Sequence, residues 1–82
     1  MIEIYGTLAC EYCSKAKELA EAHGLKYTYI DLFEGNNHEL YDEKFPNAKT
    51  VPQITWHGRH IGGYSEFARE IEETRNYGDG QV

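Results

Sequence analysis

The chain of 82 residues contains few cysteines and prolines, which stabilise small proteins, and few basic residues, which bind polyanions. It has two cysteines and two prolines, and its 8 lysines and arginines are outnumbered by 14 aspartates and glutamates, so the net charge is -6. Nucleic acids and anionic membranes would repel such a chain, and neither is expected as a partner. No apolar run approaches the length of a transmembrane helix.

The N-terminal stretch also lacks the features of a secretory signal peptide. Glu3 and Gly6 stand where such a peptide would have basic residues followed by an apolar run. We therefore expect a cytoplasmic protein. In that compartment thiols are kept reduced, so a disulfide between the two cysteines would be transient rather than structural.

What the sequence does contain is the composition of one small globular domain. Hydrophobic residues make up 40% and charged residues 27%, which is an ordinary mixture for a folded chain. The length leaves no room for a second core. Residues 1–76 are expected to form the domain, and residues 77–82 a frayed C-terminal tail.

Hydrophobic periodicity and breaker residues predict seven regular segments, in the order strand, helix, strand, helix, strand, strand, helix. The strands are residues 2–5, 25–32, 53–56 and 59–61. The helices are residues 11–23, a short helix that follows Asn36 and ends before Pro46, and a last helix from 66 onward. The first two strands should be parallel, and the later hairpin should add an antiparallel half. The expected architecture is α/β, with a four-stranded mixed sheet and three helices.

Two helix starts are predicted from capping residues. Asn36 followed by Glu39 resembles a capping box. Ser65 is expected to cap the last helix. The buried face of that helix would then carry Phe67, Ala68 and Ile71.

The only two cysteines, Cys10 and Cys13, stand three apart at the start of a predicted helix. They would make a poor structural staple, because a disulfide that closes so short a loop constrains the unfolded chain least. A structural zinc ion needs four ligands. His57 and His60 could supply two, but they flank a hairpin tip and nothing aims them at Cys10. Redox chemistry accounts better for the placement, and no metal is expected.

The helix start would favour a thiolate on Cys10. The first N–H groups of a helix are unpaired and the helix dipole adds partial positive charge there, so the pKa of the Cys10 thiol should lie below the ordinary ~8.5. A stable thiolate is also a good leaving group when a mixed disulfide is resolved. Cys13, one turn deeper, should stay protonated and act as the resolving thiol. The other interpretation of Cys13 is a small buried hydrophobic residue.

Three motifs, in this order, resemble the glutaredoxins of the thioredoxin fold: CEYC (10–13), TVPQI (50–54) and IGGYSEF (61–67). The likeness covers nearly the whole chain. It implies a thioredoxin-like fold and a glutathione-dependent thiol–disulfide oxidoreductase. Cys10 would attack a substrate disulfide, Cys13 would resolve the mixed disulfide, and glutathione would regenerate the dithiol.

The resemblance also implies where glutathione, the reducing co-substrate, would bind. Val51–Pro52 would be a cis peptide bond facing the active cysteine, with backbone groups that pair with a peptide. Gly62-Gly63 would let the backbone approach the ligand, and the last helix would offer N–H groups to the γ-glutamyl carboxylate. Ser65 stands where the family often has an aspartate that meets the ligand's ammonium group. The full expected set is Tyr12, Lys49, Thr50, Val51, Pro52, Gly62, Gly63, Tyr64 and Ser65.

Two departures from the family pattern affect this site. Glu11 follows Cys10 where the family usually has proline, and its negative charge opposes the thiolate. We therefore expect a less acidic Cys10 and a more reducing couple than in the proline form. The family's basic residue shortly before the first cysteine is absent, because residues 7–9 carry no charge. Lys49 is the remaining candidate for the glycine carboxylate, so glutathione binding should be weaker than usual.

Two other functions stay open on the sequence. A redoxin of the same fold could be reduced directly by a flavoprotein reductase; Gly62-Gly63-Tyr64 favours glutathione, whereas the missing basic residue favours the flavoprotein. Some glutaredoxins carry an iron–sulfur cluster between two subunits, but such carriers usually lack the second cysteine. The expected partners are glutathione and a disulfide-containing protein, with ribonucleotide reductase as the family's frequent client. The chain is expected to be a monomer.

Overall fold

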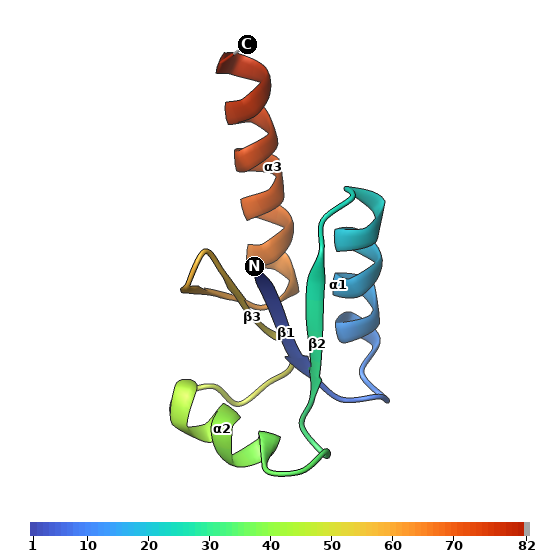
Figure 1. Cartoon of the computed structure of the whole chain (residues 1–82), viewed down its shortest axis with the longest axis vertical. Coiled ribbons are helices and arrows are strands. Elements are labelled where there is room, and N and C mark those ends of the chain that lie inside the picture. Colours follow the sequence, from blue (N-terminus) through green and yellow to red (C-terminus); the bar gives the residue numbers. More distant parts are fainter. Residues whose placement is uncertain (82) are drawn as a thin grey trace.

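The computed structural model describes the backbone of residues 1–81 and the side chains of residues 1–73. Its elements follow the predicted order (Figure 1). They are β1 (Ile2–Gly6), α1 (Glu11–Ala22), β2 (Tyr27–Asp31), α2 (Asn37–Lys44), β3 (Gln53–Trp56), β4 (Arg59–Gly62) and α3 (Tyr64–Gln81). The expected tail, residues 77–82, lies beyond the described side chains, so the domain boundary at residue 76 stays a prediction.

The four strands form one mixed sheet in the order β2-β1-β3-β4. β1 pairs with β2 in parallel, with Gly6 opposite Asp31, and β3 is antiparallel to both β1 and β4. Alternation along β1 sends Ile2 and Ile4 to one apolar cluster and Tyr5 to another. The predicted fold class, α/β with a four-stranded mixed sheet and three helices, is confirmed.

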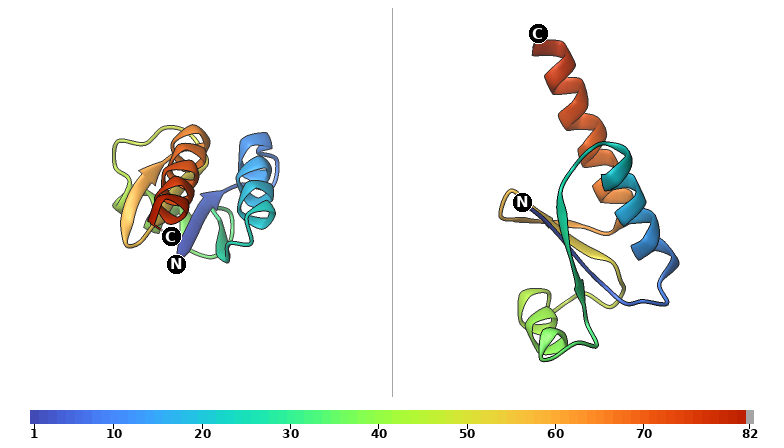
Figure 2. Two further views of the ribbon diagram at one scale, coloured as in Figure 1. Left: turned by 90° about the horizontal axis from the view of Figure 1, so that it is seen from above. Right: turned by 45° about the vertical axis from the view of Figure 1, so that its right-hand side comes forward.

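The main core lies between the sheet and the helices α1 and α3, which pack together on one face (Figure 2). Its buried members are Ile2, Ile4, Ala16, Ala20, Ile54, Trp56, Phe67 and Ile71. Each large side chain fully buried here contributes roughly 1.5–3 kcal/mol of transfer free energy. Phe67 and Ile71 are therefore on the buried face of the last helix as predicted, while Ala68 is half-buried.

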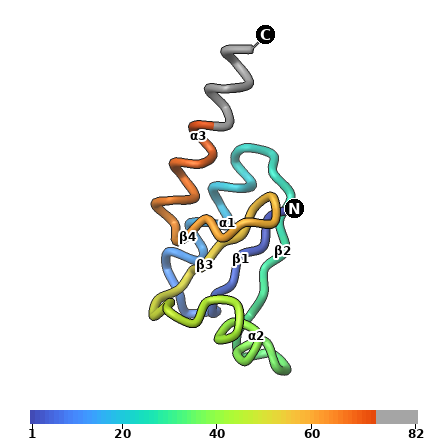
Figure 3. The backbone as a smooth tube through the Cα atoms, turned by 90° about the vertical axis from the view of Figure 1, so that its left-hand side faces the viewer, coloured from blue at the N-terminus to red at the C-terminus, as the bar shows by residue number. Residues whose placement is uncertain are grey.

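A second cluster anchors α2 at the end of the sheet where β2 ends (Figure 3). Tyr5, Leu32, Tyr41 and Phe45 form it, and the rings of Tyr5 and Phe45 meet edge-on with centroids 5.2 Å apart. In the described part of the chain, no helix is long and apolar enough to cross a bilayer.

The capping box predicted at the start of α2 is wrong. Asn36 is the N-cap residue, but its side chain makes no capping hydrogen bond. Its φ of -102° and ψ of 22° depart from the extended conformation in which such a side chain reaches the helix. The Asn36 carbonyl instead accepts the N–H groups of Glu39 and Leu40 at 3.1 and 3.2 Å.

The predicted cap of the last helix is also wrong, because α3 begins at Tyr64 and Ser65 lies inside its first turn. The Gly63 carbonyl accepts the N–H of Phe67 at 3.0 Å. The Glu66 carboxylate turns back to accept the N–H of Gly63 at 2.9 Å. This is half of a capping box, with glycine at the cap and glutamate three residues later.

The two histidines of the β3–β4 hairpin, His57 and His60, contact different groups. His57 and Gly58 have φ of 58° and 73°, the positive values that a tight two-residue turn requires. His57 stacks on Trp56, whereas His60 Nε2 lies 2.7 Å from the amide oxygen of Gln53. Within the described part of the chain, no three His, Cys, Asp or Glu side chains gather as a metal site would require.

Candidate active site

Cys10 stands at the N-cap of α1, where the helix offers an N–H group to its sulfur. Its backbone is extended, with φ of -104° and ψ of 114°, and its Sγ accepts the N–H of Cys13 at 3.1 Å. Unpaired N–H groups and the helix dipole both stabilise negative charge at this point. The expected position of Cys10, just before the first helical residue, is confirmed.

The two sulfurs are joined in a disulfide and differ in exposure. The Cα atoms of Cys10 and Cys13 are 5.2 Å apart. Cys10 is half-buried, whereas Cys13 is 0% exposed. A large substrate can therefore reach only the first sulfur, and the second is placed to attack Cys10 alone.

The loop before β3 brings a carbonyl close to the same sulfur. The Val51–Pro52 bond is cis, as the family resemblance implies. The Val51 oxygen lies 3.8 Å from Cys10 Sγ. A disulfide sulfur has no proton to donate, but a reduced thiol could donate here, which would favour the neutral form. The Cys13 N–H, whose nitrogen lies 3.1 Å from the same sulfur, would favour the thiolate instead.

Gly6, the last residue of β1, belongs to the site although sequence analysis missed it. A Cβ at this position would collide with Cys13 Sγ and lie 2.7 Å from the Tyr29 hydroxyl. Only a residue without a side chain fits between these groups. The available signal was a glycine that ends a strand four residues before CEYC.

Tyr29 holds the segment that leads from β1 to Cys10. Its hydroxyl donates to the Thr7 carbonyl at 2.5 Å. Burial, with a smaller contribution from the Asp31 carboxylate, raises the pKa of Tyr29 above its ordinary value. The hydroxyl therefore remains a donor at neutral pH, and the loop stays anchored.

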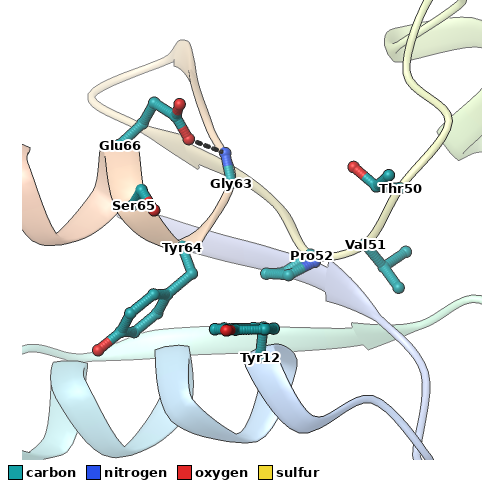
Figure 4. A pocket seen from close by; sticks show the side chains of 8 residues that line it. All are labelled: Tyr12, Thr50, Val51, Pro52, Gly63, Tyr64, Ser65 and Glu66. Atoms are coloured by element: carbon teal, nitrogen blue, oxygen red, sulfur yellow. Dashed lines mark hydrogen bonds between the residues drawn. The ribbon is translucent and has the colours of Figure 1, made fainter.

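A groove of about 190 Å³ opens beside the cysteine pair (Figure 4). It is lined by Tyr12, Thr50, Val51, Pro52, Gly63, Tyr64, Ser65 and Glu66. Three segments that are distant in the sequence meet here: the start of α1, the loop before β3 and the start of α3. The structure thus brings together seven of the nine expected binding residues, but not Lys49 or Gly62. The binding role of all nine stays a prediction.

Two tyrosines form one wall of the groove. The rings of Tyr12 and Tyr64 have centroids 5.7 Å apart and are tilted by 46° (Figure 4). Tyr12 is 53% exposed, so it is available to a ligand instead of being packed in the core. Such faces suit the apolar parts of a peptide.

Charge near the site differs from the sequence-based picture in two ways. Glu66 was not among the expected residues, and it is the one charged residue among the groove-lining residues that the structure describes. The Glu11 carboxylate lies 3.4 Å from the ammonium of Lys15, and both side chains are largely exposed. Exposed pairs contribute little energy, but Lys15 offsets part of the Glu11 charge. The effect of Glu11 on Cys10 should therefore be small.

Two cysteines at the start of a helix can form and break a disulfide. With one sulfur accessible and the other buried, such a pair performs thiol–disulfide exchange. On this sheet, it defines a thiol–disulfide oxidoreductase of the thioredoxin-like fold. The family model described as Glutaredoxin matches residues 2–61. The chain belongs to the glutaredoxin family.

Known proteins that are similar to this chain support its assignment to the glutaredoxin family. It is 39% identical over 77 residues to Glutaredoxin 1 of Escherichia coli K12, covering 85% of this chain and 91% of that protein. The structure of reduced Escherichia coli glutaredoxin matches with a TM-score of 0.75 at 33% identity, over 92% of this chain and 96% of that one. A buckwheat glutaredoxin–glutathione complex has a TM-score of 0.75 at 24% identity, over 89% and 69%. At that identity the buckwheat likeness establishes the fold.

Proposed function

We propose that this chain reduces protein disulfides and glutathione mixed disulfides through Cys10 and Cys13, with glutathione as the electron donor. It would act as a monomer in the cytoplasm, and ribonucleotide reductase is the first protein client to test. The groove is the observation that carries the proposal. It lies beside the half-buried Cys10 and is lined by the loop before β3 and by the start of α3.

An extended tripeptide suits this arrangement. Peptides commonly pair with exposed backbone groups, and the Val51 loop lies against Cys10 Sγ, where the cysteine of glutathione has to sit. The first N–H groups of α3 suit the γ-glutamyl carboxylate. The Glu66 carboxylate, rather than Ser65, supplies the negative charge for the ligand's ammonium group. The buckwheat glutaredoxin with this fold was solved with glutathione, which adds support.

The exchange runs in two steps. The Cys10 thiolate attacks one sulfur of the substrate disulfide; that bond breaks, the other sulfur leaves as a thiolate and takes a proton, and a mixed disulfide forms. Cys13 then attacks Cys10 Sγ and releases the second substrate thiol. Two electrons have passed to the substrate, and two glutathione molecules return them as they become glutathione disulfide.

The electron donor can be identified by two coupled assays on the same protein. One contains glutathione, glutathione reductase and NADPH; the other contains a flavoprotein disulfide reductase and NADPH without glutathione. We expect turnover in the first assay alone. Turnover sustained by the flavoprotein without glutathione would overturn the proposed donor.

Replacing Glu66 with glutamine should weaken the use of glutathione. The amide keeps the size of the side chain and can still accept the Gly63 N–H, but it loses the charge that would meet the ammonium group. We expect the KM for glutathione to rise about five- to twentyfold, which corresponds to the loss of one charge-assisted hydrogen bond at a partly exposed site. Steady-state kinetics at fixed substrate measure this change.

The matched control is Glu72→Gln, which makes the same charge change on an exposed residue of α3 outside the groove. It should leave the KM for glutathione unaltered. Equal shifts in the two variants would mean that net charge alone matters, and Glu66 would have no specific role.

A further inference from the structure

Two large apolar side chains near the redox-active loop are almost fully exposed. Leu8, two residues before Cys10, and Phe33, just after β2, are each 80% exposed. Single exposed apolar residues are common on proteins, but these two lie on the loops that follow the neighbouring strands β1 and β2, at the same end of the sheet. The N–H of Leu32 donates to the Gly6 carbonyl at 2.9 Å, so the loops after β1 and β2 start side by side (Figures 1 and 3).

Hydrogen bonds hold the backbone segments that carry these two side chains. The N–H of Phe33 donates to Asp31 Oδ1 at 2.9 Å, and the Asp31 carbonyl accepts the Asn37 side-chain amide at 2.9 Å. On the other loop, the Thr7 carbonyl accepts the Tyr29 hydroxyl. A surface whose backbone is already ordered loses less conformational entropy when a partner binds. These loops are therefore preorganised for contact.

The uncompensated acidic charge of this surface lies beside Phe33. On the Leu8 side a lysine is present, because Lys17 lies 4.4 Å from the ring centroid of Tyr29, which bonds the Thr7 carbonyl. Asp31 lies two residues before Phe33 and Glu34 directly after it, and among the described side chains neither carboxylate is in an ion pair. Glu11 shares its charge with Lys15, one turn further on. A partner that covers the apolar side chains would gain further from basic groups at its edges. A small anionic disulfide would gain from neither.

We propose that Leu8 and Phe33, here called the Leu8–Phe33 surface, dock the disulfide-bearing segment of a protein substrate in which apolar and basic residues flank the reactive cysteine. The apolar residues cover Leu8 and Phe33, and the basic residues meet Asp31 and Glu34. The dithiol supplies two electrons, the substrate disulfide becomes two thiols, and Cys10 and Cys13 become a disulfide. This inference deepens the proposed reduction of protein disulfides and does not depend on glutathione as the donor.

Single-turnover reduction of designed peptides tests this docking. The full chain is reduced with dithiothreitol, freed of it, and mixed with peptides of equal length that each hold one cysteine in a mixed disulfide with 2-mercaptoethanol. The flanking residues are either leucine and phenylalanine or serine, each combined with either lysine or glutamate. Acid quenching and chromatography give the second-order rate constants. The apolar, lysine-bearing peptide should react about ten- to a hundredfold faster than the serine- and glutamate-bearing one, as expected for two gained contacts.

Variants of the surface separate docking from chemistry. Leu8→Ser and Phe33→Ser should each lower the rate with the apolar peptides about five- to tenfold relative to 2-hydroxyethyl disulfide. Leu40→Ser, which changes an exposed leucine of α2 outside this surface, should leave that ratio unaltered. An unaltered ratio in the first two variants, or an equal fall with the serine peptides, would overturn the proposal. So would a native dimer that Leu8→Ser dissociates in sedimentation, because the surface would then bind a second copy of the chain.

Discussion

Serine in place of Cys10 should lower the rate of disulfide reduction by at least about a thousandfold, the scale of loss seen when a covalent nucleophile is removed. Cys10 is the sulfur that a substrate can reach, and it accepts the N–H of Cys13 at 3.1 Å. A hydroxyl at that position neither ionises near neutral pH nor forms a disulfide. Reduction of 2-hydroxyethyl disulfide measures the effect, with circular dichroism to verify that the variant is folded.

Serine in place of Cys13 should instead trap the substrate. Because Cys13 is 0% exposed, its loss leaves the attack by Cys10 intact and removes the intramolecular second step. Mass spectrometry should find a mixed disulfide on Cys10 that dithiothreitol releases. Cys13→Ala avoids a buried hydroxyl and should trap the same species. Trapping through Cys13 in the Cys10→Ser variant would reverse the two roles.

Replacing Gly6 with alanine should damage both stability and the second chemical step. The added Cβ would collide with Cys13 Sγ and approach the Tyr29 hydroxyl to 2.7 Å, so one of these groups must move. Overpacking of this kind costs about 1–3 kcal/mol of unfolding free energy, or roughly 5–20 °C in Tm for a domain of this size. A displaced Cys13 should attack about ten- to a hundredfold more slowly. Quenched-flow measurement of the mixed disulfide would show its longer lifetime.

Gly24→Ala is the matched control for that substitution. Gly24 has a φ of 66° and nothing within 4 Å of a built Cβ, so alanine there adds backbone strain of about 1–2 kcal/mol without a collision. It should lower Tm but leave the lifetime of the mixed disulfide unaltered. Equal lifetimes in the two glycine variants would mean that the space beside Cys13 does not control its attack.

The sequence predicted those parts of the fold that depend on local signals. Hydrophobic alternation located the strands, and the position of Cys10 just before α1 followed from the helical spacing of the residues after it. Gly24 ends that helix with the positive φ that a glycine allows. The cis bond before Pro52 was also predicted, but from the family resemblance of the motif TVPQI and not from a local signal.

The parts that failed depend on where a side chain finds its partner in three dimensions. Asn36 has the right identity for a cap but the wrong backbone angles. Glu66 looks like an ordinary exposed residue of a helix until its carboxylate meets Gly63. Gly6 looks like the end of a strand, and its role appears only when Cys13 and Tyr29 arrive from other elements.

The pH dependence of alkylation of the reduced native chain is the most direct test of the central claim, that the amide groups at the start of α1 stabilise a sulfur anion. Iodoacetamide should modify Cys10 first, as located by peptide mass mapping, with a rate midpoint well below the ~8.5 of a free thiol. Glu11→Pro should lower that midpoint slightly further. A midpoint at or above ~8.5, or first modification at Cys13, would contradict the account.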